Sequence, residues 1–308
     1  MTSDLERIKK QEEILRIVAF YDIFSFPLTI FEIKKALFSL NTLSDLENIL
    51  GSAPMVAKLE RKNGFYFLKG RREIIDSRNR RYNYSSKKIR TAKFFAKIFV
   101  KLPFILGIYL ANSIGAYNLR EESDIDFFII TKSKRIWLSR FFCAGLMKLL
   151  NKRPNKRTKK NKICLSFYLS ENNLNLSDLK IKSGDPYFDF WEKNLLLLED
   201  KNNINQKFLE VNGLAAYYDL SLTQGQSFSK LNQSSKKGNS LTVNVFNYLE
   251  KLSYRLQVKI MPALLREAAE MKDGLSGVVL SDNIIKLYLK DRRLEIKKKY
   301  EEKLAKII

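Results

Sequence analysis

The sequence predicts an α+β protein with a mixed α/β region, a small sheet with helices, in the middle of the chain. Three apolar runs, separated by turns and one helical pattern, indicate the strands of this sheet: residues 104–111, 125–131 and 162–170. Helical patterns and a hairpin precede this region, and mainly helical patterns follow it. We therefore expect three domains, with a polar linker at 223–240 inside the last: 1–70, 71–184 and 185–308.

The first 70 residues combine three helical patterns with a hairpin at Asn63-Gly64, and in this order they resemble a winged helix. Thr29 is the expected N-cap of the second helix, with Glu32 three residues later as in a capping box. Winged helices often bind DNA through the third helix and the hairpin. Here the third helix carries Asp45 and Glu47 but no Lys or Arg, which are the usual readers of the major groove. DNA binding and a packing or partner role both stay open for this domain.

The chain is strongly basic, with a formal net charge of +23 over 308 residues. Such a charge favours anionic partners, including nucleic acid and nucleotides. The charge gathers in the loop 151–162 and on one helix face, formed by Arg90, Lys93, Lys97 and Lys101. Two interpretations are open for each cluster: a solvent-exposed charged surface, or a contact with an anionic substrate.

Several classes of site are excluded, because the chain has no histidine and no CxxC motif. The usual zinc sites, Ser–His triads and Cys–His dyads all need these residues. We expect Cys143 and Cys164 to be buried small hydrophobic residues in a reducing cytoplasm. The start of the chain lacks the apolar segment of a secretory signal, and the most apolar stretch, 94–111, is interrupted by two lysines and a proline. We therefore expect a cytoplasmic protein without a membrane span.

The stretch "LANSIGAYNLREESDIDFFIIT", residues 110–131, is the one that indicates chemistry. Asp124 and Asp126 are two residues apart at the start of an apolar strand, so they point to the same face. Like charges at this separation repel one another unless a cation lies between them, and Mg²⁺ prefers carboxylate and phosphate oxygens. The alternative is a solvent-exposed strand entrance with Ser123 as a cap.

This stretch resembles the DNA-polymerase-β-type nucleotidyltransferases, especially the small prokaryotic members, and the match covers about residues 88–170. In that family a glycine-serine pair is followed, after ten residues, by Asp-x-Asp. Ser113 and Asp124 keep this spacing, and Arg120 to Phe127 matches the family's approach to the carboxylates. The resemblance implies that Asp124 and Asp126 are the catalytic metal ligands, for Mg²⁺.

The same resemblance implies a nucleotide-binding set consisting of Asn112, Ser113, Arg120 and Ser123. Ser113 and nearby backbone N–H groups would hold the phosphates of a nucleoside triphosphate, and Arg120 would position the loop or the phosphates. Asn112 stands where the family has glycine, and asparagine tolerates the left-handed backbone conformation better than most residues.

A second departure concerns the third carboxylate that active members carry on a later strand, as a base or metal ligand. The corresponding strand, "KICLSFYLS", contains no acid. We expect Ser166 at the equivalent position, with Glu171 and Asp178 as alternative sources of a carboxylate.

Three functions follow from these observations. The leading one is a Mg²⁺-dependent nucleotidyltransferase that moves a nucleoside monophosphate from a triphosphate to an acceptor hydroxyl on a protein, an RNA or a small molecule. The first alternative is a catalytically degenerate member of the same fold that binds nucleotide or nucleic acid as a sensor or adaptor. The second alternative is a winged-helix DNA-binding regulator.

Overall fold

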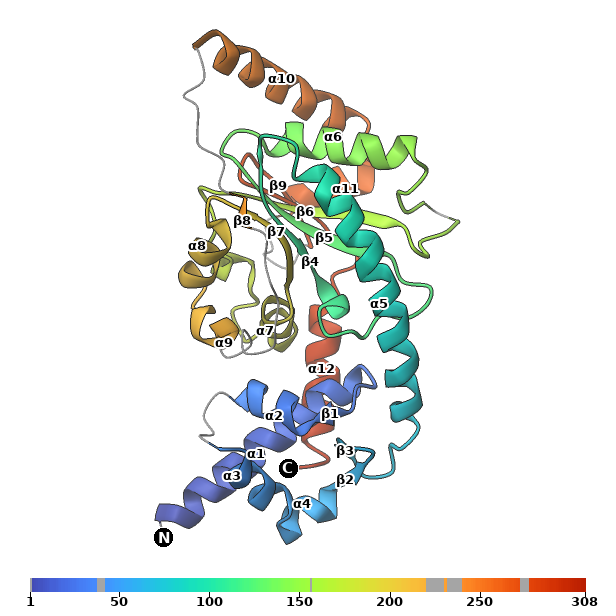
Figure 1. Ribbon diagram of the computed structural model, residues 1–308, viewed down its shortest axis with the longest axis vertical. Helices are drawn as coiled ribbons and strands as arrows, with labels where there is room; N and C mark the ends of the chain where they lie inside the picture. Colours follow the sequence, from blue (N-terminus) through green and yellow to red (C-terminus); the bar gives the residue numbers. More distant parts are fainter. Residues whose placement is uncertain (1, 38–41, 156, 220–229, 232–239, 272–276) are drawn as a thin grey trace. The chain divides into compact units, whose positions relative to one another are not determined.

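The computed structural model describes residues 2–37, 42–155, 157–219, 230–231, 240–271 and 277–308. The chain divides into two compact units, and each is described by itself. One unit comprises Met1–Asn83 and Arg292–Ile308, and the other comprises Tyr84–Tyr218 and Gln224–Asp291. The fold is therefore mixed α+β, as the sequence predicts, with one sheet in each unit (Figure 1).

The first unit contains helices and a small antiparallel sheet in the strand order β1-β3-β2. Its elements, in chain order, are α1 (Thr2–Ile23), β1 (Leu28–Thr29), α2 (Ile30–Leu37), α3 (Leu43–Leu50), α4 (Ala53–Lys58), β2 (Leu59–Lys62), β3 (Phe65–Leu68) and the C-terminal α12 (Arg293–Leu304). The three helices and the hairpin are those that the sequence predicts. The short helix α4 and the return of the C-terminus to this unit are additional.

Two local sequence signals determine the geometry of this unit. The backbone N–H of Thr29 donates to the Glu32 carboxylate at 2.8 Å, and the Glu32 N–H donates to the Thr29 hydroxyl at 3.3 Å. This reciprocal pair is the predicted capping box. Asn63 and Gly64 have φ of 53° and 79°, the left-handed values that a two-residue hairpin turn requires.

The second unit contains a seven-stranded sheet in the order β8-β7-β4-β5-β6-β10-β9. Its strands are β4 (Ile105–Leu110), β5 (Ile125–Thr131), β6 (Ile163–Ser170), β7 (Leu196–Lys201), β8 (Lys230–Leu231), β9 (Val278–Leu280) and β10 (Ile284–Leu287). The central pair β5–β6 is parallel, and β4 is antiparallel to both β5 and β7. The three strands that the sequence predicts, β4, β5 and β6, are adjacent at the centre.

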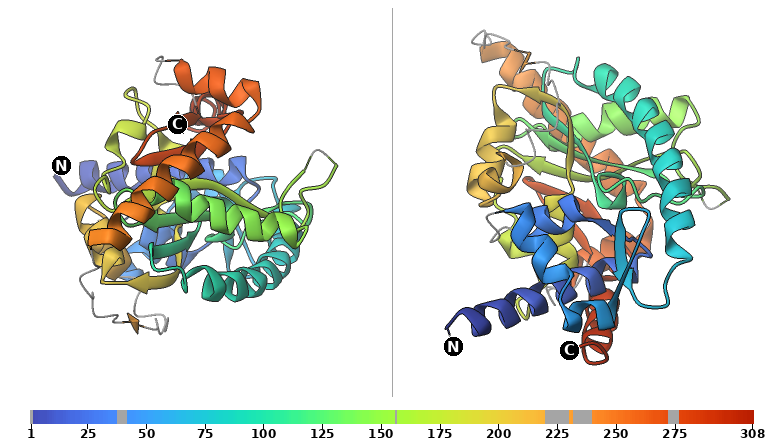
Figure 2. Two further views of the ribbon diagram at one scale, coloured as in Figure 1. Left: turned by 90° about the horizontal axis from the view of Figure 1, so that it is seen from above. Right: turned by 60° about the horizontal axis from the view of Figure 1, so that its bottom comes forward.

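Helices cover both faces of this sheet (Figures 1 and 2). On one face α5 (Ile74–Phe99) and α6 (Ile136–Leu149) pack on apolar side chains of β4, β5 and β6. On the other face α7 (Pro186–Lys193) and α8 (Ile204–Val211) do the same. The remaining helices are η1 (Asn112–Ile114), η2 (Ser177–Leu179), α9 (Ala215–Asp219), α10 (Ser240–Lys259) and α11 (Ala263–Glu270).

The C-terminal part of the chain is organised differently from the expected separate helical domain over 185–308. Strands β7, β9 and β10 come from this part and join the central sheet, where β7 hydrogen-bonds to β4 and β10 to β6. Helix α10 runs beside α6, where the Glu250 carboxylate accepts the backbone N–H groups of Trp137 and Leu138 (Figure 2). The polar linker expected at 223–240 lies outside the described residues, except for β8 and Ser240 at the start of α10.

Candidate functional site

The Asp-x-Asp motif lies where the end of β4 meets the start of β5. These strands are antiparallel, and the Ala111 N–H donates to the Asp126 carbonyl at 3.0 Å. The 3₁₀ helix η1, with Asn112 and Ser113, therefore begins directly beside Asp126. The sequence-predicted turn and carboxylates are thus brought together at one edge of the sheet.

Asp124 and Asp126 are both half-buried and lie close together. Their ligand oxygens and the Cys164 sulfur all lie within 4.8 Å of one another. Burial, and then repulsion from Asp124, raises the pKa of Asp126 to about 7, and burial also raises the pKa of Asp124. In the absence of a cation, the pair therefore holds its negative charge at an energetic cost.

Asn112 positions Asp126. Its φ is 62°, so the left-handed conformation expected at this point of the turn is present. Its side-chain amide donates to the Asp126 carboxylate, and the Tyr187 hydroxyl donates to the Asn112 Oδ1 at 3.4 Å. A glycine at this position would permit the same backbone but not the hydrogen bonds.

Cys164, rather than the expected Ser166, is the β6 residue beside Asp126. The parallel register pairs Asp126 with Cys164, and a bulge follows between Asp126 and Phe128. Ser166 lies two residues further along the strand, with its hydroxyl 2.8 Å from the Cys164 sulfur. Cys143 is buried, as expected, but Cys164 is only half-buried and belongs to the site. Sequence reasoning missed it because a cysteine inside an apolar strand has the pattern of a core residue.

The alternative sources of a third carboxylate do not join the pair. Glu171 follows the far end of β6 and accepts the Ser133 N–H at 3.1 Å, at the opposite end of the strand from Cys164. Asp178 is exposed in η2. Among the described residues, Asp124, Asp126 and Cys164 are the only carboxylates and thiols that form a cluster with metal-ligand spacing.

The loop before Asp124 is held by Lys88, a residue that the sequence did not single out. The buried Lys88 ammonium donates to the carbonyl oxygens of Arg120, Glu121 and Ser123, at 3.1, 2.7 and 2.5 Å. The Arg120 side chain is exposed, and Ser123 takes part in this contact through its backbone carbonyl. Lys88 therefore fixes the path of the chain into the carboxylate pair.

The basic loop 151–162 lies beside the same approach loop. Lys160 forms ion pairs with Glu121 and Glu122, at 2.6 and 3.1 Å, and the Asn161 N–H donates to the Ser123 carbonyl. The positive charge of Lys159 lowers the pKa of both Asp124 and Asp126, although burial outweighs it. Lys160 of the basic loop thus neutralises acids of the approach loop, while Lys159 places positive charge near Asp124 and Asp126.

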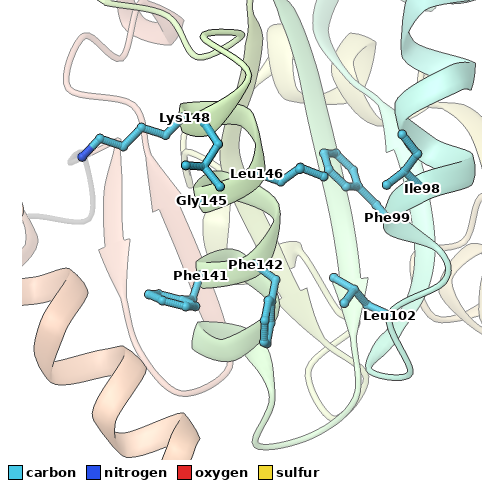
Figure 3. A pocket seen from close by; sticks show the side chains of 9 residues that line it. Ile98, Phe99, Leu102, Phe141, Phe142, Gly145, Leu146 and Lys148 are labelled. Atoms are coloured by element: carbon cyan, nitrogen blue, oxygen red, sulfur yellow. The ribbon is translucent and has the colours of Figure 1, made fainter.

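A separate apolar groove of about 820 Å³ lies between α5 and α6 (Figure 3). Phe99 of α5 and Leu146 of α6 point toward each other across it, and Lys148 points away. Of the predicted basic face, Arg90, Lys93 and Lys97 lie on α5 and Lys101 follows its end. All four are exposed, and the apolar face of the helix is buried. The groove shares no residue with the carboxylate cluster, so it is a distinct feature of the second unit.

No helix in the described part of the chain has the length and apolar character needed to cross a membrane. Comparisons with protein-family models, with curated proteins and with solved structures find no match to this chain.

Proposed function

We propose that this protein is a metal-dependent nucleotidyltransferase that acts in the cytoplasm. The observation that carries the proposal is the juxtaposition of Asp124 and Asp126 with the turn that bears Asn112 and Ser113. Two half-buried carboxylates with no ion pair to a cation among the described residues fit a divalent cation, and Mg²⁺ with triphosphate oxygens is the pairing that such sites favour. The sequence resemblance to polymerase-β-type enzymes points to the same chemistry.

In the proposed reaction, an acceptor hydroxyl attacks the α-phosphorus of a nucleoside triphosphate. The bond between the α-phosphorus and the bridging oxygen breaks, pyrophosphate leaves, and the hydroxyl proton passes to solvent. Asp124 and Asp126 would hold Mg²⁺, which would neutralise charge on the phosphates when bound. The protein's part is positioning and electrostatics, because phosphoryl chemistry needs little covalent work from side chains.

The chain's own residues would divide this work. Ser113 and the backbone N–H groups of η1 would face the β- and γ-phosphates, and Asn112 would keep Asp126 in place through its amide. Lys159 and Arg120 would supply positive charge near the triphosphate. The exposed basic face of α5 would attract a polyanionic acceptor such as RNA.

The test is incubation of the full-length protein with Mg²⁺ and each α-labelled ribonucleoside triphosphate, with the chain itself and total RNA as acceptors. Wild type is compared with the double variant Asp124→Asn/Asp126→Asn and with Asp178→Asn, an exposed acid outside the cluster. We expect the double variant to lose label transfer and at least about tenfold in triphosphate affinity, and Asp178→Asn to retain both. Unchanged triphosphate binding in the double variant would remove the proposed site.

A second function is favoured by Cys164, which occupies the place beside Asp126 where a third carboxylate is expected. Without that carboxylate the fold would bind a nucleotide or nucleic acid as a sensor or adaptor rather than turn it over. This alternative predicts that Mg²⁺ and a triphosphate raise the melting temperature without release of pyrophosphate. Pyrophosphate production above that of the double variant would exclude it.

The third function, a DNA-binding regulator, gains no support from the first unit. The exposed residues of α3 include Asp45 and Glu47, which would face the phosphates of a bound duplex unfavourably. A steep fall of DNA affinity with salt, lost on substitution of hairpin cations such as Arg61 and Lys62, would be needed to restore this alternative.

A further inference from the structure

The donor set beside Asp126 is mixed, because it contains one sulfur as well as two carboxylates. Asp124 directly precedes β5, Asp126 is its second residue, and Cys164 is the residue of β6 that pairs with Asp126. The three ligand atoms lie within 4.8 Å of one another, close enough to surround a single ion. A site of three protein ligands leaves a fourth position open for water or substrate.

The carboxylate pair forms no ion pair with a lysine or arginine among the described residues, although the charges of Lys88 and Lys159 act on Asp124. The Lys88 ammonium, buried nearby, is turned to three backbone carbonyls of the approach loop rather than to the carboxylates. Lys159 likewise lowers the pKa of both carboxyl groups through its charge, and in the described part of the chain it forms no hydrogen bond or ion pair with either of them. In a protein with a net charge of +23, an acidic pair left without an ion pair points to a bound cation.

Tyr288 supplies an independent observation. Its hydroxyl oxygen is buried and has no hydrogen-bond partner among the described residues. Tyr288 directly follows β10, whose antiparallel pairing with β6 runs from Ile284–Leu169 to Lys286–Phe167, toward the end of β6 that bears Cys164. Its ring meets that of Phe167 edge to face, so Tyr288 lies at the same end of the strand as the cluster. A buried hydroxyl without a partner is costly unless a ligand or ordered water accepts its proton.

We infer that Asp124, Asp126 and Cys164 form a three-ligand site for a thiophilic divalent cation of the Zn²⁺ class, with the Tyr288 hydroxyl facing its open position. Thiolate sulfur favours Zn²⁺ and Cd²⁺, whereas Mg²⁺ takes oxygen ligands. The inferred site shares Asp124 and Asp126 with the proposed nucleotidyltransferase site, and it rests on that proposed function in no other respect. It assigns Cys164 a role as a metal ligand and predicts that, without nucleotide, the site prefers Zn²⁺ or Cd²⁺ to the Mg²⁺ of the proposed transfer reaction.

The test is a titration of the full-length, EDTA-treated protein with Cd²⁺, followed through the ultraviolet band of the cadmium–thiolate bond. The chain has two cysteines, so Cys143→Ala is the matched control for Cys164→Ser. We expect the wild type and Cys143→Ala to give the band and to saturate at about one Cd²⁺ per chain. Cys164→Ser should lack the band and bind Cd²⁺ at least about tenfold more weakly. Asp124→Asn retains the cysteine and should still give the band, but its Cd²⁺ affinity should fall by a similar factor.

Competition defines the ion preference: Zn²⁺ should displace Cd²⁺ at far lower concentration than Mg²⁺. The inference is overturned by an undiminished band in Cys164→Ser, by unchanged affinity in Asp124→Asn, or by displacement with Mg²⁺ as readily as with Zn²⁺. Cadmium-113 NMR of the wild-type protein tests the inference without a variant, and therefore still applies if a substituted protein fails to fold. A resonance typical of oxygen ligands alone would overturn the inference. No nucleotide is present, so the outcome is independent of the transfer assay.

Discussion

At the scale of single residues, Asn112 supports the site through both its backbone and its side chain. Its φ of 62° is strained for alanine but not for glycine, and its amide donates to Asp126. We expect Asn112→Ala to reduce the free energy of unfolding by about 1–3 kcal/mol, and Asn112→Gly to be the more stable variant by about 1 kcal/mol. Urea denaturation measures both. An alanine variant as stable as the glycine variant would show that backbone strain is absent.

The raised pKa of Asp126 predicts a pH dependence of stability in the metal-free protein. Its ordinary value of 3.8 applies to the unfolded chain, and burial followed by repulsion from Asp124 raises it to about 7 in the fold. Between about pH 4 and pH 7 the folded protein therefore binds more protons, so stability falls as pH rises and levels off above that range.

We expect Asp126→Asn to flatten this slope, because asparagine does not titrate. Urea unfolding in EDTA from pH 4 to pH 8, with wild type and variant side by side, measures the difference. Other carboxyl groups with raised pKa values, such as Glu192 and Glu250, contribute equally to both proteins and cancel. Equal slopes in the two proteins would contradict the assignment to Asp126.

The residues of the site were predictable to different degrees for physical reasons. Asp124, Asp126 and Asn112 lie close together in sequence, and a strand-turn-strand connection must bring them together. Cys164 comes from a strand 38 residues after Asp126, and its place beside Asp126 depends on the register of the β5–β6 pair. A two-residue shift in register keeps every side chain of β6 on the same face, so the sequence pattern does not distinguish Cys164 from Ser166 as the neighbour of Asp126.

At the scale of elements, Gly115 determines how η1 packs. A Cβ at this position would lie 1.7 Å from the carbonyl oxygen of Asn194, just after α7, so the turn or the helix end must move. A Cβ on Gly145, inside α6, would meet no described atom within 4 Å, so this glycine serves as the matched control.

We expect Gly115→Ala to lower the free energy of unfolding by more than about 2 kcal/mol and to weaken Cd²⁺ binding, because η1 is displaced from Asp126. Gly145→Ala should be neutral or stabilise α6 by up to about 1 kcal/mol. Denaturant unfolding and the cadmium titration measure the two effects. Equal stability of the two variants would mean that η1 accommodates a side chain without moving.

Elements with strong local signals were predictable, and elements defined by distant partners were not. The capping box at Thr29 and the Asn63-Gly64 turn act within a few residues, and both appear as expected. The run "LLLLED" has no period that distinguishes helix from strand, and it forms β7 because β4 offers an open edge. Strands β9 and β10 have three and four residues, too few for a pattern to develop.

At the scale of the whole molecule, the order of the chain does not match the order of its compact units. The C-terminal part supplies β7, β10 and β9 to the sheet of the second unit, and then α12 to the first unit. Domain boundaries drawn from composition assume that neighbours in sequence fold together. Here the pairing of β7 with β4 and of β10 with β6 joins distant parts of the chain, and no local pattern in 185–308 predicts it.

The return of α12 to the first unit gives a prediction that tests this organisation. Asp22 of α1 has a side chain that is only 1% exposed, and it accepts a hydrogen bond from Lys303 of α12. Arg71 lies 3.3 Å from the same carboxylate, and the rings of Phe20 and Tyr300 meet edge to face. The two ends of the chain are therefore joined through a buried charge and an aromatic contact.

We expect Lys303→Met to lower the free energy of unfolding by about 2 kcal/mol, because the buried Asp22 carboxylate then keeps Arg71 as its one cationic partner among the described residues. Lys298→Met is the matched control, since its side chain is 79% exposed and its ion pair with Glu302 spans 3.9 Å. That variant should change stability by less than about 0.5 kcal/mol. Calorimetry compares them, and equal melting temperatures would contradict a structural role for α12 in the first unit.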